Sequence, residues 1–161
     1  QPQVHSGTTT LLPYQHPTVR ALITEAKFHH STFAYRLLGT ILDHYLQSQS
    51  AANLIPVPLS TTRKKQRGYN QVVEILKRTN NPQFPVKDFL QRTRDTKEQS
   101  QLSRHERLTN VTDCFVLKQT PDMNHPLIVV DDVMTTGATL TAALKPLQAA
   151  GFSVTAIALA H

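Results

Sequence analysis

The sequence predicts an α/β fold with a mostly parallel central sheet, and three observations support this. Over the last two-thirds of the chain, short apolar runs alternate with amphipathic stretches, which is typical of strand–helix–strand units. One apolar run, 127–131, leads through adjacent acids into a hydroxyl-rich turn and a helix-forming stretch. The length of 161 residues suits one domain with its own core.

The first half of the chain predicts three helices and one strand. Residues 1–12 are polar and turn-rich, and we expect no regular structure there. A first helix begins with Thr18 as its cap and ends near Phe28, and a short third helix covers about 70–77. A strand is expected over 53–59, followed by a basic loop. The second helix, Thr32 to Leu46, is expected to bury six side chains: Phe33, Leu37, Leu38, Ile41, Leu42 and Tyr45.

The second half predicts four strands and one long helix. The strands are expected at 88–91, 114–116, 127–131 and 153–159. The long helix is expected over about 138–149, with a kink at Pro146 and a stop at Gly151. Residues 92–100 are polar and aperiodic, and a short helix is predicted over 103–108.

Positive charge predominates and is unevenly distributed. Lys and Arg total 17 against 11 acids, which gives a formal charge of +6. One basic group is Arg63, Lys64, Lys65 and Arg67, and a second is Arg92, Arg94, Lys97, Arg104 and Arg107. Such density indicates an anionic partner, either phosphates on a small molecule or a nucleic-acid backbone. A solvated basic face is the other interpretation.

Composition limits the class of protein further. No apolar run approaches the roughly 20 residues that a membrane span needs, so we expect no membrane insertion. The one cysteine, Cys114, excludes an internal disulfide and a cysteine-rich zinc site, and we expect it to be a buried thiol. These features are compatible with a reducing compartment, and we expect a cytoplasmic protein.

The stretch 127–140 has the clearest chemistry. Unpaired backbone N–H groups at a helix start attract phosphate, and Gly137 allows close approach of the backbone. Asp131 and Asp132 would repel phosphate, so we expect them to accept hydrogen bonds from ribose hydroxyls or to hold hydrated Mg²⁺. Ligands of open α/β sheets bind beyond the carboxyl ends of strands, which favours a site for a phosphorylated ribose. Three threonines add hydroxyl donors: Thr135, Thr136 and Thr139.

This stretch resembles the phosphoribosyl-pyrophosphate (PRPP) binding motif of type I phosphoribosyltransferases: an apolar run, Asp-Asp, then Thr-Thr-Gly-x-Thr. A second stretch, 55–71, resembles the Pro-Val-Pro and Arg-Gly-Phe-Asn-Gln segment of the competence protein F (ComF) family, with Tyr69 in place of Phe. The resemblance runs from about residue 14 to the end. Further matching residues are Lys27, Phe28, Thr96, Gln99, Leu102, Arg107, Asn110, Val111 and Phe115. Many members also carry a four-cysteine zinc module, for which this chain lacks the cysteines.

The resemblance implies a type I phosphoribosyltransferase fold in a single domain, with a helical hood over about 1–50 and a core over about 51–161. It implies a PRPP site formed by nine residues: Asp131, Asp132, Val133, Met134, Thr135, Thr136, Gly137, Ala138 and Thr139. The two aspartates are also the implied Mg²⁺ site, directly or through water. Arg63, Arg67 and Lys27 are the implied pyrophosphate ligands. Segment 92–101 resembles the loop that closes over the site, where Arg94 and Lys97 would reach the leaving pyrophosphate as catalytic residues.

The implied function is Mg²⁺-dependent displacement of pyrophosphate from C1 of PRPP by a nitrogen nucleophile that the sequence does not identify. The transition state is oxocarbenium-like, so the protein's task is mostly electrostatic. The family is associated with natural competence, the uptake of external DNA as single strands, which makes DNA and competence-machinery proteins expected partners. The alternative is a protein without turnover that binds nucleotides or single-stranded DNA through Arg63, Lys64, Lys65 and Arg67.

Overall fold

The computed structural model describes residues 2–5, 7–93, 114–119 and 125–161. Its main sheet has the strand order β1-β2-β7-β6-β3, and a small second sheet pairs β4 with β5. The strands are β1 (Gln3–His5), β2 (Thr8–Leu12), β3 (Asn53–Pro56), β4 (Leu90–Arg92), β5 (Phe115–Leu117), β6 (Leu127–Val133) and β7 (Val154–Ala160). The helices are α1 (Pro17–Phe28), α2 (Thr32–Leu46), α3 (Thr61–Arg67), α4 (Gln71–Leu76) and α6 (Ala138–Ala149).

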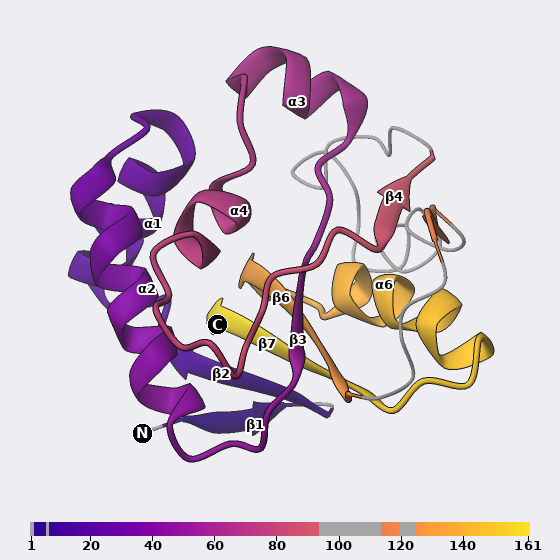
Figure 1. The fold of residues 1–161 in the computed structure, drawn as a ribbon. Helices are drawn as coiled ribbons and strands as arrows, with labels where there is room; N and C mark the ends of the chain where they lie inside the picture. Colours follow the sequence, from indigo (N-terminus) through magenta and orange to yellow (C-terminus); the bar gives the residue numbers. More distant parts are fainter. Residues whose placement is uncertain (1, 6, 94–113, 120–124) are drawn as a thin grey trace.

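The predicted fold class, an α/β protein with a mostly parallel sheet flanked by helices, is confirmed. Within the main sheet, β2 with β7, β7 with β6 and β6 with β3 are parallel, and only β1 with β2 is antiparallel. Helices α1 and α2 lie on one side of the sheet and α6 on the other (Figure 1). The expected elements after residue 114 occur with shifts of one or two residues at their ends.

The sheet separates two hydrophobic cores, because successive side chains of a strand point to opposite faces. In β6, Ile128 and Val130 pack into the core beneath α1, α2 and α4, whereas Leu127 and Val129 pack into the core beneath α6. Strand β7 alternates in the same way. The buried thiol of Cys114 lies in the second core, as expected.

The expectation that residues 1–12 lack regular structure is wrong, because Thr8–Leu12 forms β2 and enters the main sheet beside β7. Thr8 and Thr10 are buried there, each opposite a small residue of β7, Ala156 and Ala158 respectively. The polar composition concealed the strand, since threonine is a good strand former even though it is not apolar.

The predicted basic loop is instead the helix α3, which follows β3 on the side toward which the parallel strands point (Figure 1). Ser60 caps its start by accepting a hydrogen bond from the Arg63 N–H at 3.3 Å, and Gly68 ends it with a left-handed φ of 78°. The helix buries none of its residues, so it shows no apolar periodicity from which a helix is predicted.

Helix α2 has the predicted bounds, but two of its expected core residues are outside the core. Phe33 is 72% exposed and Leu37 is 39% exposed, whereas Leu38 and Leu42 are buried. The apolar stripe of α2 is wider than the surface that its neighbours cover. At Gly39 the helix approaches α4 closely, and a Cβ there would lie 3.1 Å from the Cβ of Arg78.

Candidate functional site

The turn between β6 and α6 forms one wall of the candidate site. Gly137 is the N-cap of α6 and has φ 75°, a conformation that favours glycine. No side chain caps the helix from this position, and its first turn has no acidic residue. Thr136 Oγ1 accepts a long hydrogen bond, 3.4 Å, from the Ala138 N–H. A helix start with this composition attracts an anion.

The two adjacent aspartates point to opposite sides of the sheet. Asp132 lies on the side of α1 and α4, where it contacts Lys27 and Gln71. Asp131 lies on the side of α6 and lines the hollow formed by the turn residues 133–140. Because strand side chains alternate, the two neighbouring carboxylates have different surroundings, although both line the same pocket. The expectation that the two carboxylates accept ribose hydroxyls or hold hydrated Mg²⁺ stays a prediction, and it now concerns two carboxylates in different environments.

Asp132 is buried and is held by three donors. Lys27 Nζ lies 3.1 Å from Oδ2, and Gln71 Nε2 donates to the same oxygen at 2.6 Å. The backbone N–H of Val133 donates to Oδ1 at 2.7 Å. Its side chain is 7% exposed, so these donors replace the water that the carboxylate loses on burial.

Asp131 is half-buried, and its carboxylate has weaker support. Burial, and after it the negative charge of Asp132, raise the pKa of Asp131 to about 7. A hydrogen bond from the Asp132 N–H to Oδ1, 2.9 Å long, and the charges of Lys27 and Arg92 oppose this shift. A cation or a ligand hydroxyl beside Asp131 would stabilise its ionised form.

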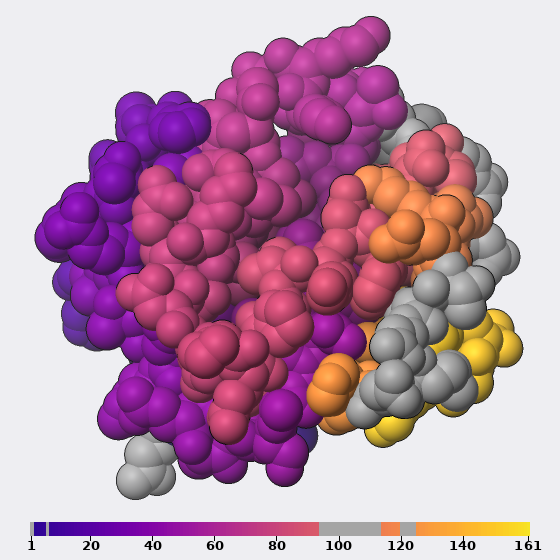
Figure 2. All heavy atoms as spheres, in the orientation of Figure 1, coloured from indigo at the N-terminus to yellow at the C-terminus, as the bar shows by residue number. Residues whose placement is uncertain are grey.

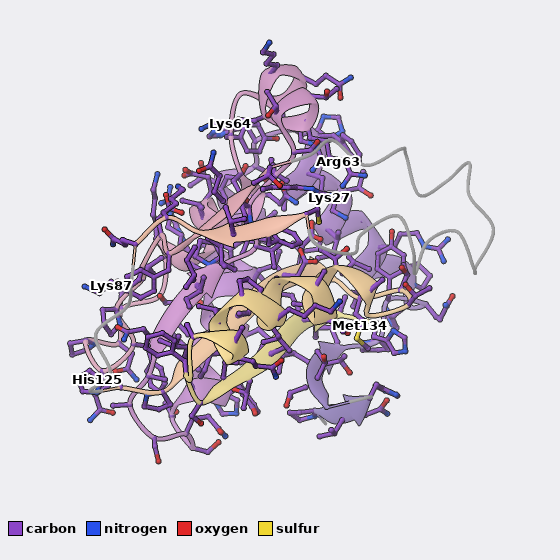
Figure 3. All side chains as sticks on the ribbon, turned by 90° about the vertical axis from the view of Figure 1, so that its right-hand side faces the viewer. Lys27, Arg63, Lys64, Lys87, His125 and Met134 are labelled. Carbon is purple, nitrogen blue, oxygen red and sulfur yellow. The ribbon has the colours of Figure 1, made fainter. Side chains whose placement is uncertain are left out.

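Helix α3 divides its four cations between two directions. Arg63 and Arg67 are one turn apart, are half-buried, and line a pocket of about 240 Å³ together with Lys27, Asp131 and Asp132. Thr135 and Thr139 of the turn line the same pocket. Figure 3 shows Lys27 and Arg63 at the same end of the molecule, while Lys87 and His125 lie at the far edge.

Lys64 and Lys65 do not line this pocket. Both are exposed, so the four cations predicted to bind nucleic acid are split between a pocket-facing pair and an outer pair. No ion pair between an acid and α3 occurs among the residues that the structure describes.

The C-terminal end of α1 is fixed onto the start of α4, and this places Lys27. The Tyr69 hydroxyl donates to the Lys27 carbonyl at 3.0 Å and accepts from the His30 N–H at 3.1 Å. The Arg67 guanidinium lies 5.0 Å from the centre of the Phe28 ring, a cation–π distance. Arg67 Nη1 also donates to Gln71 Oε1 at 3.1 Å, so the pocket cations and Asp132 form one connected network.

Most of the predicted site residues line the pocket or the adjoining turn. Arg94 and Lys97 lie outside the described residues. Met134 and Ala138 are buried beneath the turn and support it. Arg92 of the second basic group also lines the pocket, together with Gln71 and Tyr14, for which no role was expected. Gln71 is the last residue of the segment 55–71 that resembles the ComF family, and this resemblance is the sequence feature that could have indicated its role.

The donor set suits Mg²⁺ better than a transition metal. No group of three or more His, Cys, Asp or Glu side chains able to hold a metal occurs among the described residues. Mg²⁺ is commonly held by one or two carboxylates, with water and substrate phosphates completing its shell. Asp131 and Asp132 with the threonine hydroxyls meet this minimum. Among the described residues, Lys27 pairs with Asp132, and no ion pair between a Lys and Asp131 occurs.

The fold and site define an α/β protein in which a glycine-capped helix start and a pocket lined by lysine and arginine side chains lie at the carboxyl ends of the parallel strands. The chain is similar to "Competence protein ComFC" of Streptococcus pneumoniae, with 28% identity over 125 residues, or 78% of this chain and 54% of that protein. This similarity confirms the predicted resemblance to the ComF family. The chain spans about half the length of this curated relative.

No family model matches the chain. A hypoxanthine phosphoribosyltransferase from Staphylococcus aureus is similar in structure, with a TM-score of 0.39 and 13% identity, over 88% of this chain and 62% of that one. A TM-score this low says nothing about the ligand of the present chain. In the part of the chain that is described, none of the helices has both the length and the apolar character of a membrane span.

The raised pKa of Asp131 predicts a pH-dependent stability. Between pH 4 and pH 7 the unfolded chain loses this proton while the folded chain keeps it, so stability falls as pH rises through that window. Urea unfolding of the wild type and Asp131→Asn should show the wild type losing on the order of 1–2 kcal/mol relative to the variant. A difference that stays constant from pH 4 to pH 8 would contradict the environment assigned to Asp131.

The ion pair between Lys27 and Asp132 predicts strong energetic coupling. Lys27→Met should lower the free energy of unfolding by about 1–3 kcal/mol, because it leaves a buried carboxylate without its cation. Adding Asp132→Asn should recover part of that loss, giving a coupling of about 1–2 kcal/mol in a double-mutant cycle. The control Lys77→Met removes the more exposed pair with Glu74 and should cost less than about 0.5 kcal/mol. Additive effects at Lys27 and Asp132 would refute the pairing.

Proposed function

We propose that the chain binds PRPP, or a closely related ribose phosphate, together with Mg²⁺ and acts as a phosphoribosyltransferase. The observation that carries this proposal is the convergence of Lys27, Arg63 and Arg67 on one pocket with Asp131 and the 135–139 turn. A ribose with phosphates at both ends needs an anion site at each end and hydroxyl acceptors between them. The pocket has these three parts: the cations at one end, Asp131, and the threonines of the turn.

Each part of the pocket has a role in this proposal. The turn takes the 5-phosphate through backbone N–H groups and threonine hydroxyls. Three of the four cations that line the pocket, Lys27, Arg63 and Arg67, take pyrophosphate, and their charge stabilises it as the bond to C1 breaks. Asp131 accepts a ribose hydroxyl and, with Asp132, is the proposed Mg²⁺ site. When bound, Mg²⁺ would neutralise part of the pyrophosphate charge.

Asp132 has a positioning role as well. Its carboxylate holds Lys27 from α1 and Gln71 from α4, and Gln71 in turn accepts from Arg67. Two of the three cations are thereby oriented before a ligand arrives, which lowers the cost of ordering them. Arg94 and Lys97 remain proposed catalytic residues that reach the pyrophosphate.

The proposal places the protein in natural competence and in the cytoplasm. The similarity to ComFC supports the competence role. Binding of single-stranded DNA or a nucleotide without turnover is the second candidate, and two exposed lysines of α3, Lys64 and Lys65, favour it. Such a backbone contact would depend strongly on salt. The two candidates use different faces of the same helix.

Titration calorimetry with PRPP and Mg²⁺ tests the proposal. Arg63→Ala should weaken PRPP binding at least tenfold, because it removes a cation from the pocket. Lys87→Ala removes a charge at the far edge of the molecule and should leave the affinity unchanged (Figure 3). Pyrophosphate release with an acceptor then separates turnover from binding alone. Absence of PRPP binding, together with single-strand DNA binding that Lys64→Ala/Lys65→Ala abolishes, would favour the second candidate and refute the first.

A further inference from the structure

His161 lies at the carboxyl end of β7, beside the turn between β6 and α6. Its Nδ1 lies 2.9 Å from the Met134 carbonyl oxygen. A carbonyl oxygen can only accept a hydrogen bond, so Nδ1 carries a proton and is the donor. Met134 is the last residue before the turn 135–139, and its own N–H donates to the Ala160 carbonyl at 2.9 Å. The end of β7 therefore holds both the N–H and the carbonyl of Met134.

The backbone of His161 connects the same end of the sheet to another part of the pocket wall. Its N–H donates to the Leu12 carbonyl at 3.0 Å, and its carbonyl accepts from the Tyr14 N–H at 2.8 Å. Tyr14 lines the pocket that contains Asp131. Tyr14 and the turn, which lie far apart in the sequence, are therefore both attached to His161.

A second histidine, His5 of β1, packs against the imidazole of His161. The two ring centroids are 4.5 Å apart, and the ring planes are tilted by 56°. His5 Nε2 lies 3.0 Å from Gln3 Oε1, which fixes the second ring in turn. Although His161 is exposed, these contacts hold its ring in the orientation that reaches Met134. From the side shown in Figure 2, α4 and the chain that follows it cover the end of β7, which Figure 1 marks with C.

The direction of the Met134 carbonyl sets the direction of the next N–H, because a peptide unit is planar and trans. The Met134 carbonyl and the Thr135 N–H belong to one such unit and point in opposite directions. Thr135 lines both the hollow of the turn and the pocket that contains Asp131. Within the described part of the chain, the Thr135 N–H makes no hydrogen bond, so it is available to a ligand.

We infer that His161 is a positioning residue for the turn 135–139. By donating from Nδ1 to the Met134 carbonyl, it orients the Thr135 N–H as a donor to the 5-phosphate of the ribose. This inference rests on the proposed function, in which the turn takes that phosphate. The three cations proposed to take pyrophosphate belong to α1 and α3, so His161 acts on ribose 5-phosphate and not on pyrophosphate.

Calorimetry with two separate probes, ribose 5-phosphate and pyrophosphate with Mg²⁺, tests the inference. His161→Leu removes the Nδ1 donor and should weaken ribose 5-phosphate binding about fivefold or more, while pyrophosphate binding stays unchanged. His161→Asn places an amide N–H one bond from Cγ, as in the Nδ1–H of histidine, and should recover most of the affinity. The control His125→Leu removes a histidine at the far edge of the molecule and should bind both probes like the wild type (Figure 3).

The position of the ring proton is a second test, and it needs neither a ligand nor a variant. At a pH high enough for a neutral ring, His161 should be the Nδ1–H tautomer, because the hydrogen bond to Met134 requires that proton. ¹⁵N NMR of the wild type distinguishes the two tautomers. The Nε2–H tautomer at His161 would overturn the inference, even if His161→Leu did not fold.

The titrations also separate this inference from the proposed function. If the wild type does not bind ribose 5-phosphate, both are refuted. If the wild type binds it and His161→Leu binds it equally well, the inference alone is overturned. An equal loss of ribose 5-phosphate and pyrophosphate binding, or a loss that His161→Asn does not recover, indicates a general structural effect and also overturns the inference. In these last cases the proposed function still stands.

Discussion

The site is organised around one buried carboxylate, that of Asp132. A carboxylate that is 7% exposed is tolerated only when donors replace its water, and here the donors come from three separate elements. Lys27 arrives from α1, Gln71 from α4 and the Val133 N–H from the end of β6. The requirement to satisfy Asp132 thus fixes where two helices stand relative to the sheet. Asp132 thereby also orients two cations of the pocket, because Lys27 pairs with it directly and Arg67 donates to its partner Gln71.

The pleat of β6 gives the neighbouring aspartate a different chemistry. Asp131 points toward α6 and the hydroxyl-rich turn, where burial and the charge of Asp132 raise its pKa to about 7. One aspartate is therefore neutralised by the protein itself, and the other is left to be neutralised by a proton, a cation or a ligand. The two aspartates are identical and adjacent in the sequence, but Asp132 is held by three donors and Asp131 faces the turn.

A second pocket lies beside the one that contains Asp131, and Pro58, Leu59 and Arg92 line both. Helix α3 turns Arg63 and Arg67 toward the pocket that contains Asp131 and turns Lys64 toward the second pocket, a separation that follows from helical geometry. Tyr69 holds the end of α1 through its hydroxyl, at the position where the ComF family segment has Phe. That contact fixes the backbone of Lys27 and is a feature of this chain's own sequence.

The sequence predicted the parts of the fold whose signal is apolar periodicity or a strong local motif. The bounds of α2, the strand β6 and the turn at Gly137 were all expected from such patterns. Strand β2 and helix α3 were missed, because one buries threonines and the other buries nothing. The opposite directions of Asp131 and Asp132 follow from the alternation of side chains along a strand, and the sequence motif alone does not show this. Gln71 acquires its role only through a contact 61 positions away.

The most direct test of this account is a crystal structure of the protein with ribose 5-phosphate and Mg²⁺. The account predicts the phosphate at the 135–139 turn, within hydrogen-bonding distance of the first N–H groups of α6, with a ribose hydroxyl on Asp131. It also predicts that Lys27 and Gln71 still hold Asp132. A phosphate bound on the outer face of α3 at Lys64 and Lys65, with the turn and Asp131 free of ligand, would contradict it.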